Sequence, residues 1–322
     1  MSTTSTLLIL AILGLNVILA IFVIFVQKYL LSSLDFKFPV AMTMSNYIIT
    51  WSCTELCRIL GVYHQKPWKD MPLNRDMLSL IVVVALAVPI NNLSLQFNGV
   101  GTYQLLKLLI TPTICLFEYY RNGTTLSRQR GLALIVASFG VALFTVKDLE
   151  IKFIGLFWAG LFLPISAHYK IHWKAVQKSF GPRYNALSLI HRVYPLCLPI
   201  MVPLSFFIDP PGIVSYQWNS NVILLIVVSG IVIFGICISS LYIIVAFSPL
   251  THQVLGLFKV CISLLLGVFI FGNDMPSGGQ AFGLCLALVS VVVYTVITTA
   301  DQAKQKQKQK KDLKDLIVLQ VV

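Results

Sequence analysis

The sequence predicts an all-α polytopic membrane protein with ten transmembrane helices in two inverted five-helix repeats. Composition is the first observation: 57% of the 322 residues are hydrophobic and only 11% are charged, whereas soluble domains average about 25% charged residues. The second is a series of apolar stretches of about twenty residues, the length that a helix needs to cross a bilayer. The third is an uneven distribution of lysine and arginine between the connections. The lipid bilayer is therefore an expected partner.

The apolar stretches follow one another with short connections, so no soluble domain is inserted. The first stretch has no basic region before it and is too long for a signal peptide, so we expect it to remain as a span. The predicted spans are residues 7–26, 39–60, 77–96, 102–120, 130–146, 153–173, 186–208, 222–246, 251–271 and 280–299.

Basic residues set the predicted orientation. Sixteen lysines and arginines fall on one side of the predicted membrane, whereas the connections on the other side carry only Lys28, Lys37, Lys147 and Lys152. Positive charge accumulates on the cytosolic side, so both termini should face the cytosol, and Asn122 in its Asn-Gly-Thr sequon should stay unglycosylated. The net charge of +12 thus reflects membrane orientation, and we expect no nucleic-acid partner. The sixteen residues assigned to the cytosol are Arg58, Lys66, Lys69, Arg75, Arg121, Arg128, Arg130, Lys174, Lys178, Arg183, Lys304, Lys306, Lys308, Lys310, Lys311 and Lys314.

The predicted spans divide into two halves. Five precede the connection at residues 147–152 and five follow it, and an odd number per half means that the halves insert with opposite orientations. Residues 1–150 should form the first repeat, 151–300 the second, and 301–322 a basic cytosolic tail. Inverted repeats are a common transporter architecture, with the substrate site near the bilayer midplane where the repeats meet.

Two lysines occupy similar places in the two halves. Lys107 and Lys259 lie inside apolar stretches, where a charged side chain costs about 2.5–3.5 kcal/mol on insertion scales. Helical spacing places Tyr103 on the same face as Lys107, and His252 on the same face as Lys259. Gly256 lies between His252 and Lys259 on their common face and, having no side chain, keeps that face open. The other basic residues within spans are Lys170 and Arg192.

The chain resembles the nucleotide-sugar/triose-phosphate translocators of the drug/metabolite transporter superfamily. The resemblance runs from FPVAMT at residues 38–43 through NLSLQFNGVGTYQLLK at 92–107 to SPLTHQVLGLFK at 248–259, where Ser-Pro-x-Thr-His with a lysine seven residues later is a family signature. Gln27-Lys28-Tyr29-Leu30-Leu31 resembles the segment that closes the family's first span. The resemblance implies ten helices in two inverted halves and exchange of anionic substrates.

Departures from the family pattern narrow the implied substrate. Members that carry sugar phosphates tend to follow the second lysine with arginine, whereas Val260 follows Lys259 here, as in the nucleotide-sugar branch. The motifs of GDP-mannose carriers are absent, and Cys237 stands where many relatives have asparagine. With sugar phosphates and GDP-mannose disfavoured, a UDP-sugar is the substrate that remains. The expected partners are thus a nucleotide-sugar and a nucleoside monophosphate, exchanged by alternating access across the Golgi membrane or, alternatively, that of the endoplasmic reticulum.

The two lysines would recognise phosphate, because a partly desolvated ammonium binds anions strongly. The alternative is that each lysine has a structural role or reaches toward the interface; the pairing favours binding. Arg192 could reach the same cavity, while Lys170 could instead join Lys174 at the cytosolic end. The predicted substrate-binding residues are Lys107, Lys259, Tyr103, Gln104, Thr251, His252, Arg192, Tyr194 and His191, of which the last two would contact a base.

Other classes remain as alternatives. An intramembrane enzyme would need carboxylates, a metal site or a nucleophile–base pair in its spans, and only Glu55 and Glu118 lie there, near span ends. We therefore expect no enzyme activity, no metal and no cofactor, although His168 and His172 are four residues apart. A sugar-phosphate/phosphate antiporter and a non-transporting nucleotide sensor stay open. Gly279 and Gly283 form a small-xxx-small pattern that suits helix packing or a homodimer.

Overall fold

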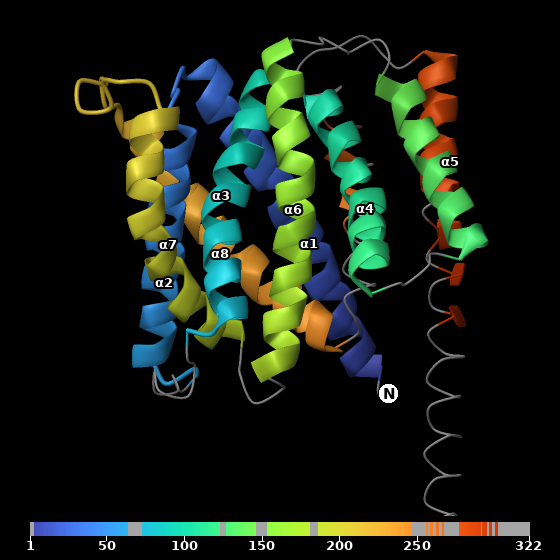
Figure 1. The fold of residues 1–322 in the computed structure, drawn as a ribbon, viewed down its shortest axis with the longest axis horizontal. Helices are drawn as coiled ribbons and strands as arrows, with labels where there is room; N and C mark the ends of the chain where they lie inside the picture. The colour runs from blue at the N-terminus through green and yellow to red at the C-terminus, as the bar shows by residue number, and fades with distance from the viewer. Residues whose placement is uncertain are drawn as a thin grey trace, which may run out of the picture.

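The structure, a computed structural model, is a bundle of helices in the part of the chain that it describes (Figure 1). It describes residues 3–63, 73–98, 100–122, 127–145, 153–180, 186–246 and 277–290, with separate residues at 256–266 and 292–301. A π-helical turn, η1 (Tyr29–Ser33), follows the first helix, and residues 278–290 form a further helical segment. The labelled helices are α1 (Thr3–Lys28), α2 (Pro39–Ile59), α3 (Arg75–Phe97), α4 (Val100–Asn122), α5 (Arg128–Thr145), α6 (Phe153–Phe180), α7 (Ala186–Ile208) and α8 (Ser220–Ala246).

The first eight predicted spans coincide with α1–α8. Helix α7 begins and ends where the sequence predicts it, and α6 differs most at its C-terminus, since it continues to Phe180 instead of ending near residue 173. The extension carries two lysines, Lys174 and Lys178, and lysine is a good helix former in water. The predicted span at 251–271 lies largely outside the described residues, and the one at 280–299 overlaps the segment 278–290.

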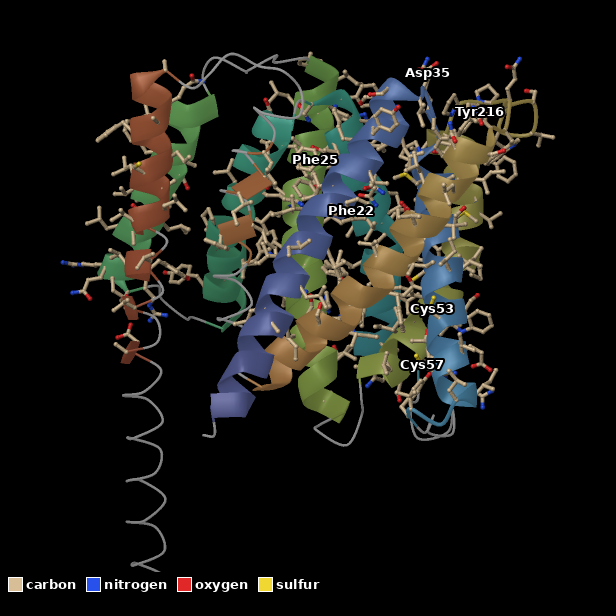
Figure 2. All side chains as sticks on the ribbon, turned by 180° about the vertical axis from the view of Figure 1, so that it is seen from behind. Phe22, Phe25, Asp35, Cys53, Cys57 and Tyr216 are labelled. Carbon is tan, nitrogen blue, oxygen red and sulfur yellow. The ribbon has the colours of Figure 1, made fainter. Side chains whose placement is uncertain are left out.

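The helices identify a polytopic membrane protein. Five stretches are long and apolar enough to cross a bilayer. Large apolar side chains also point outward from the bundle, such as Phe22 on α1 (Figure 2) and Phe206 and Phe207 on α7. Exposed apolar contacts of this extent suit lipid better than water. The five stretches are Ala11–Ser33, Arg75–Phe97, Phe153–Trp173, Leu187–Ile208 and Ser220–Ser240.

The labelled helices alternate in direction between two ends of the molecule. In Figure 1, α1 rises from the end where the N-terminus is marked, α2 returns to it, and α4 and α6 also end there. Figure 2 places Asp35 and Tyr216 at the opposite end and Cys57 toward the first. The connections rich in basic residues therefore share one end, which is the arrangement that the sequence predicts.

A central core joins α2, α3 and α7. Tyr47 of α2 stacks on Tyr194 of α7 with ring centroids 4.3 Å apart, and the Tyr47 hydroxyl donates to the Val84 carbonyl of α3 over 3.1 Å. Tyr hydroxyls need a partner when buried, so this bond fixes the depth at which the three helices pack.

Asp209, directly after α7, holds the start of α2. Its two carboxylate oxygens accept from the backbone N–H groups of Val40 (3.0 Å) and Ala41 (2.9 Å), and the Ser205 hydroxyl donates to it over 2.7 Å. The first N–H groups of a helix have no partner within it and favour negative charge. Asp209 therefore connects the C-terminal end of α7 to the N-terminal end of α2.

Glycine brings α5 and the segment 278–290 close together. A Cβ added at Gly140 would lie 2.6 Å from both the Gly283 carbonyl oxygen and the Ala287 nitrogen, so only glycine fits there. At Gly279 no heavy atom of the described residues would lie within 4 Å of an added Cβ. The close approach thus depends on Gly140 of α5, and helix packing or a homodimer contact through the Gly279/Gly283 pattern stays a prediction.

Candidate functional site

Lys107 lies one helical turn after Tyr103 on α4, and its ammonium covers the tyrosine ring. The distance from Lys107 Nζ to the ring centroid is 4.4 Å. The face of an aromatic ring attracts a cation by its quadrupole, and the spacing of four residues places the two side chains on one face of the helix. The predicted common face of Tyr103 and Lys107 is thus confirmed.

Neighbouring helices hold the Tyr103 ring in place. Its hydroxyl donates to Oδ1 of Asn91 on α3 over 2.8 Å, and its ring stacks on Phe162 of α6 with centroids 6.2 Å apart. Only 1% of Tyr103 is exposed. The platform beneath Lys107 is therefore rigid and is built from three helices.

Lys259 is held by hydrogen bonding and not by a ring. Its Nζ donates to Oδ1 of Asn16 on α1, and its backbone carbonyl accepts from the Ser263 hydroxyl over 2.5 Å. Asn16 in turn donates from Nδ2 to the hydroxyl oxygens of Ser239 (2.6 Å) and Ser240 (3.1 Å) on α8. The sequence did not single out Asn16, and an amide within a long apolar run would have been the signal.

The two predicted lysines both lie beside α1. The Tyr103 ring beneath Lys107 packs with Ile24 of α1, and Lys259 bonds to Asn16 of the same helix. A third lysine, Lys170, belongs to α6, which packs on α4. The partners described above for Lys107 and Lys259 are a ring face and an amide oxygen, both uncharged. The region is therefore cationic and suited to an anion.

The predicted residues of α7 contact α2 and α8. His191 Nε2 lies 2.8 Å from Oε2 of Glu55, which also pairs with Arg58. The Tyr194 hydroxyl lies 3.5 Å from the sulfur of Cys237 on α8. Arg192 is buried, with 5% of its surface exposed. His191 and Tyr194 lie at the α2–α7 contact, and none of the described contacts joins these two residues to the lysines.

Three predicted binding residues fall outside what the structure describes. Thr251 and His252 lie outside the described residues, and Gln104 lies on α4 without a described side chain. At Gly256, no heavy atom of the described residues would lie within 4 Å of an added Cβ. This agrees with the open face expected beside Lys259.

Lys28 corrects one detail of the predicted topology. It was assigned to a connection, but it is the last residue of α1, and its Nζ donates to three carbonyls at the end of α3: Leu95 (2.9 Å), Gln96 (3.3 Å) and Asn98 (2.8 Å). The last carbonyls of a helix lack partners within it and attract cations. Lys28 therefore joins α1 to α3 at the end of the molecule opposite the N-terminus.

Histidine does not form a metal centre in the described part of the chain. His168 stacks on Phe117 with centroids 4.5 Å apart and lies 6.1 Å from the ring of His172. Among the residues that the structure describes, no group of three His, Cys, Asp or Glu side chains could hold a metal ion. The cysteines described there, including Cys53 and Cys197, are free thiols.

Known transporters are similar to this chain along most of its length. The profile of the Triose-phosphate Transporter family matches residues 7–295. Among curated proteins of Arabidopsis thaliana, the chain is 32% identical to "Nucleotide-sugar uncharacterized transporter 1" (89% of this chain, 73% of the relative) and 25% identical to "UDP-xylose transporter 2" (90% and 81%). It is 27% identical to "UDP-rhamnose/UDP-galactose transporter 3", covering 88% of this chain and 80% of the relative.

A solved crystal structure of a protein has a similar fold. It aligns with a TM-score of 0.60 over 88% of this chain and 97% of the solved chain, at 14% sequence identity. At this identity the likeness describes the fold alone.

Proposed function

This chain belongs to the Triose-phosphate Transporter family, and from that premise we propose that it carries a UDP-sugar into the Golgi lumen in exchange for a nucleoside monophosphate. It is a transporter and not an enzyme. The observation that carries the proposal is that Lys107 and Lys259 both lie beside α1 and have uncharged partners, an aromatic ring and an amide oxygen. Phosphate groups are the common cellular anions that such a region binds well.

The proposed architecture has ten spans in two inverted repeats, residues 1–150 and 151–300, with a basic tail at 301–322. Helix packing supports it. If α1, α2 and α3 correspond to α6, α7 and α8, each contact should recur with its counterpart. Helix α1 packs on α8 as α6 packs on α3, α2 packs on α8 as α7 packs on α3, and α2 and α7 pack on each other. Lys107 and Lys259 then approach the substrate from corresponding helices.

The substrate contacts are assigned within this frame. Lys107 and Lys259 bind the phosphates, and Arg192 adds charge from α7. Gln104, Thr251 and His252 bond phosphate or sugar hydroxyls, and Tyr103 serves the site through the ring beneath Lys107. His191 and Tyr194 contact the base. The names of the relatives support the UDP-sugar class, since several are UDP-sugar transporters, and Val260 after Lys259 supports it within this chain.

Exchange of anions is proposed in place of ion coupling. Of the two acidic residues expected inside spans, Glu55 is paired with Arg58 and His191 near the end of α2. A proton or sodium pathway needs carboxylates deep in the membrane. A returning nucleoside monophosphate compensates the charge that the incoming UDP-sugar carries.

The test uses purified protein in liposomes. Vesicles preloaded with UMP should take up a UDP-sugar from a panel far faster than empty vesicles. Equal uptake into empty vesicles, or uptake that follows a proton or sodium gradient, would contradict exchange. Uptake of a triose phosphate against inorganic phosphate would identify the alternative, a sugar-phosphate antiporter. Nucleotide binding without flux would identify a sensor.

The proposed orientation places both termini in the cytosol. The basic connections support it, because they share one end of the molecule with the N-terminus (Figure 1). Tags at both ends should be accessible from the cytosolic side of sealed Golgi vesicles. Glycosylation of Asn122 in the native protein would reverse the assignment.

A further inference from the structure

Asn16 is a polar residue whose environment the transport reaction does not by itself explain. It lies in the apolar helix α1 and is completely buried, with 0% of its surface exposed. Burying an amide is unfavourable unless its hydrogen bonds are made. Both ends of this amide make bonds, Oδ1 to Lys259 and Nδ2 to Ser239 and Ser240.

The serine at position 239 determines which way the amide points. The Ser239 hydroxyl donates to the Gly235 carbonyl over 2.7 Å, so its oxygen is left as an acceptor toward Asn16. The amide must therefore turn its NH₂ group toward α8. Its oxygen then faces the ammonium of Lys259.

Close packing of α1 and α8 brings this amide into position. The two helices pack on each other and run side by side in Figure 2. A Cβ added at Gly235 would lie 3.0 Å from Cδ1 of Leu19, about one helical turn from Asn16 and Ser239. Asn16 thus links the first helix of the chain to a lysine 243 residues later.

We propose that Asn16 is a positioning residue, which holds Lys259 in the empty transporter and releases it to the phosphate of the arriving nucleotide. This inference rests on the proposed function. A neutral amide oxygen bonds the ammonium without cancelling its charge, and a phosphate oxygen bonds it more strongly because the bond is charged on both sides. An exchange of partners is therefore favourable. A carboxylate at position 16 would instead neutralise the lysine and keep it.

The test measures the affinity of the purified protein for UMP in three variants. Asn16→Asp has nearly the same shape as the natural residue but should weaken UMP binding at least tenfold. Asn16→Ala should weaken it only about two- to fivefold, because Lys259 keeps its charge and loses its anchor. In the Lys259→Met background, Asn16→Ala should cause no further loss, since the residue acts through that lysine.

Asn46 provides a matched control. It is a buried asparagine of α2, 2% exposed, and it too bonds to a serine of α8, although here its Oδ1 accepts from the Ser229 hydroxyl over 2.7 Å. Ser229 lies ten residues before Ser239, about 15 Å along the helix. Asn46→Asp should lower the melting temperature and leave the UMP affinity of the folded protein unchanged.

The order of the Asn16 variants decides the question. A purely structural asparagine would tolerate aspartate better than alanine, so an Asp variant that binds UMP as well as the Ala variant overturns the proposal. Equal losses from Asn16→Ala with and without Lys259 do the same. If Asn16→Asp does not fold, the comparison of Asn16→Ala in the natural and Lys259→Met backgrounds still tests the proposal. If the natural protein binds UMP and the variants do not differ, the positioning role fails while the transport function stands; if it binds no nucleotide, both fail.

Discussion

The two central lysines are held in different ways. Lys107 lies over the face of Tyr103, which α3 and α6 hold in place. Lys259 donates to the amide of Asn16, which two serines of α8 orient. A ring face attracts a cation without accepting one particular N–H bond, whereas an amide oxygen accepts along one direction. The first half of the chain thus offers a charge with orientational freedom, and the second half offers a charge with a defined direction.

This difference has a consequence for the substrate. A ligand that approaches both lysines meets Lys107, which can adapt its direction to the ligand. It also meets Lys259, whose fixed direction determines where a phosphate oxygen must lie. Neither environment cancels the positive charge, because neither contains a carboxylate among the partners described above. Both lysines therefore keep the electrostatic attraction that a phosphate requires.

The largest expected effect comes from removing either lysine. Lys107→Ala and Lys259→Ala should each cost at least ~1.5–3 kcal/mol of binding free energy, the worth of a charge-assisted hydrogen bond. This corresponds to roughly tenfold to hundredfold weaker binding of UMP or the UDP-sugar. Equilibrium binding and exchange in liposomes measure both. Lys37→Ala is the matched control, because Lys37 is an exposed lysine paired with Asp35 at the surface, and it should bind normally.

Arginine substitutions should separate the two sites. Lys→Arg keeps the charge and should be intermediate at both positions. A guanidinium stacks well on an aromatic ring but does not reproduce the single direction of an ammonium. Lys107→Arg should therefore retain more affinity than Lys259→Arg. Near-normal binding by both alanine variants would remove the lysines from the site, and the reverse order of the arginine variants would contradict the comparison.

The next effect concerns the ring beneath Lys107. Tyr103→Leu removes a cation–π contact worth about 0.5–2 kcal/mol, so UMP binding should weaken about two- to thirtyfold. Tyr103→Phe keeps the ring and loses only the bond to Asn91; it should lower stability by ~1 kcal/mol and change the affinity less than about twofold. Melting temperature and UMP affinity, measured on both variants, separate these effects. A Phe variant as weak as the Leu variant would show that the hydroxyl, and not the ring, serves the substrate.

The membrane-spanning helices were predictable because the bilayer sets their length. A span must contain about twenty apolar residues, and this requirement leaves a clear trace in the sequence, as the agreement of α2 and α7 with their predicted bounds illustrates. The sequence also singled out Lys107 and Lys259, because a charged residue stands out within an apolar stretch. It did not indicate which residues these two lysines contact.

The partners escaped prediction because they depend on contacts between distant segments. Asn16 and Lys259 are separated by 243 residues and Glu55 and His191 by 136, and helical periodicity relates only residues on one helix. Lys28 is a further case, because its three acceptor carbonyls belong to α3. A backbone carbonyl has no residue type, so the sequence contains no sign of it.

The smallest expected effect belongs to Lys170, the third lysine. Its side chain is exposed, and it belongs to α6, which packs on α4. Two unit charges about 10 Å apart in a water-like medium interact by ~0.4 kcal/mol, so Lys170→Gln should weaken UMP binding about twofold. Because ions screen such an interaction over about 8 Å at physiological salt, the loss should shrink between ~0.02 and ~0.5 M salt, whereas the loss in Lys259→Ala should persist. A large, salt-independent loss would mean that Lys170 contacts the phosphate directly, and the comparison would then involve three lysine sites instead of two.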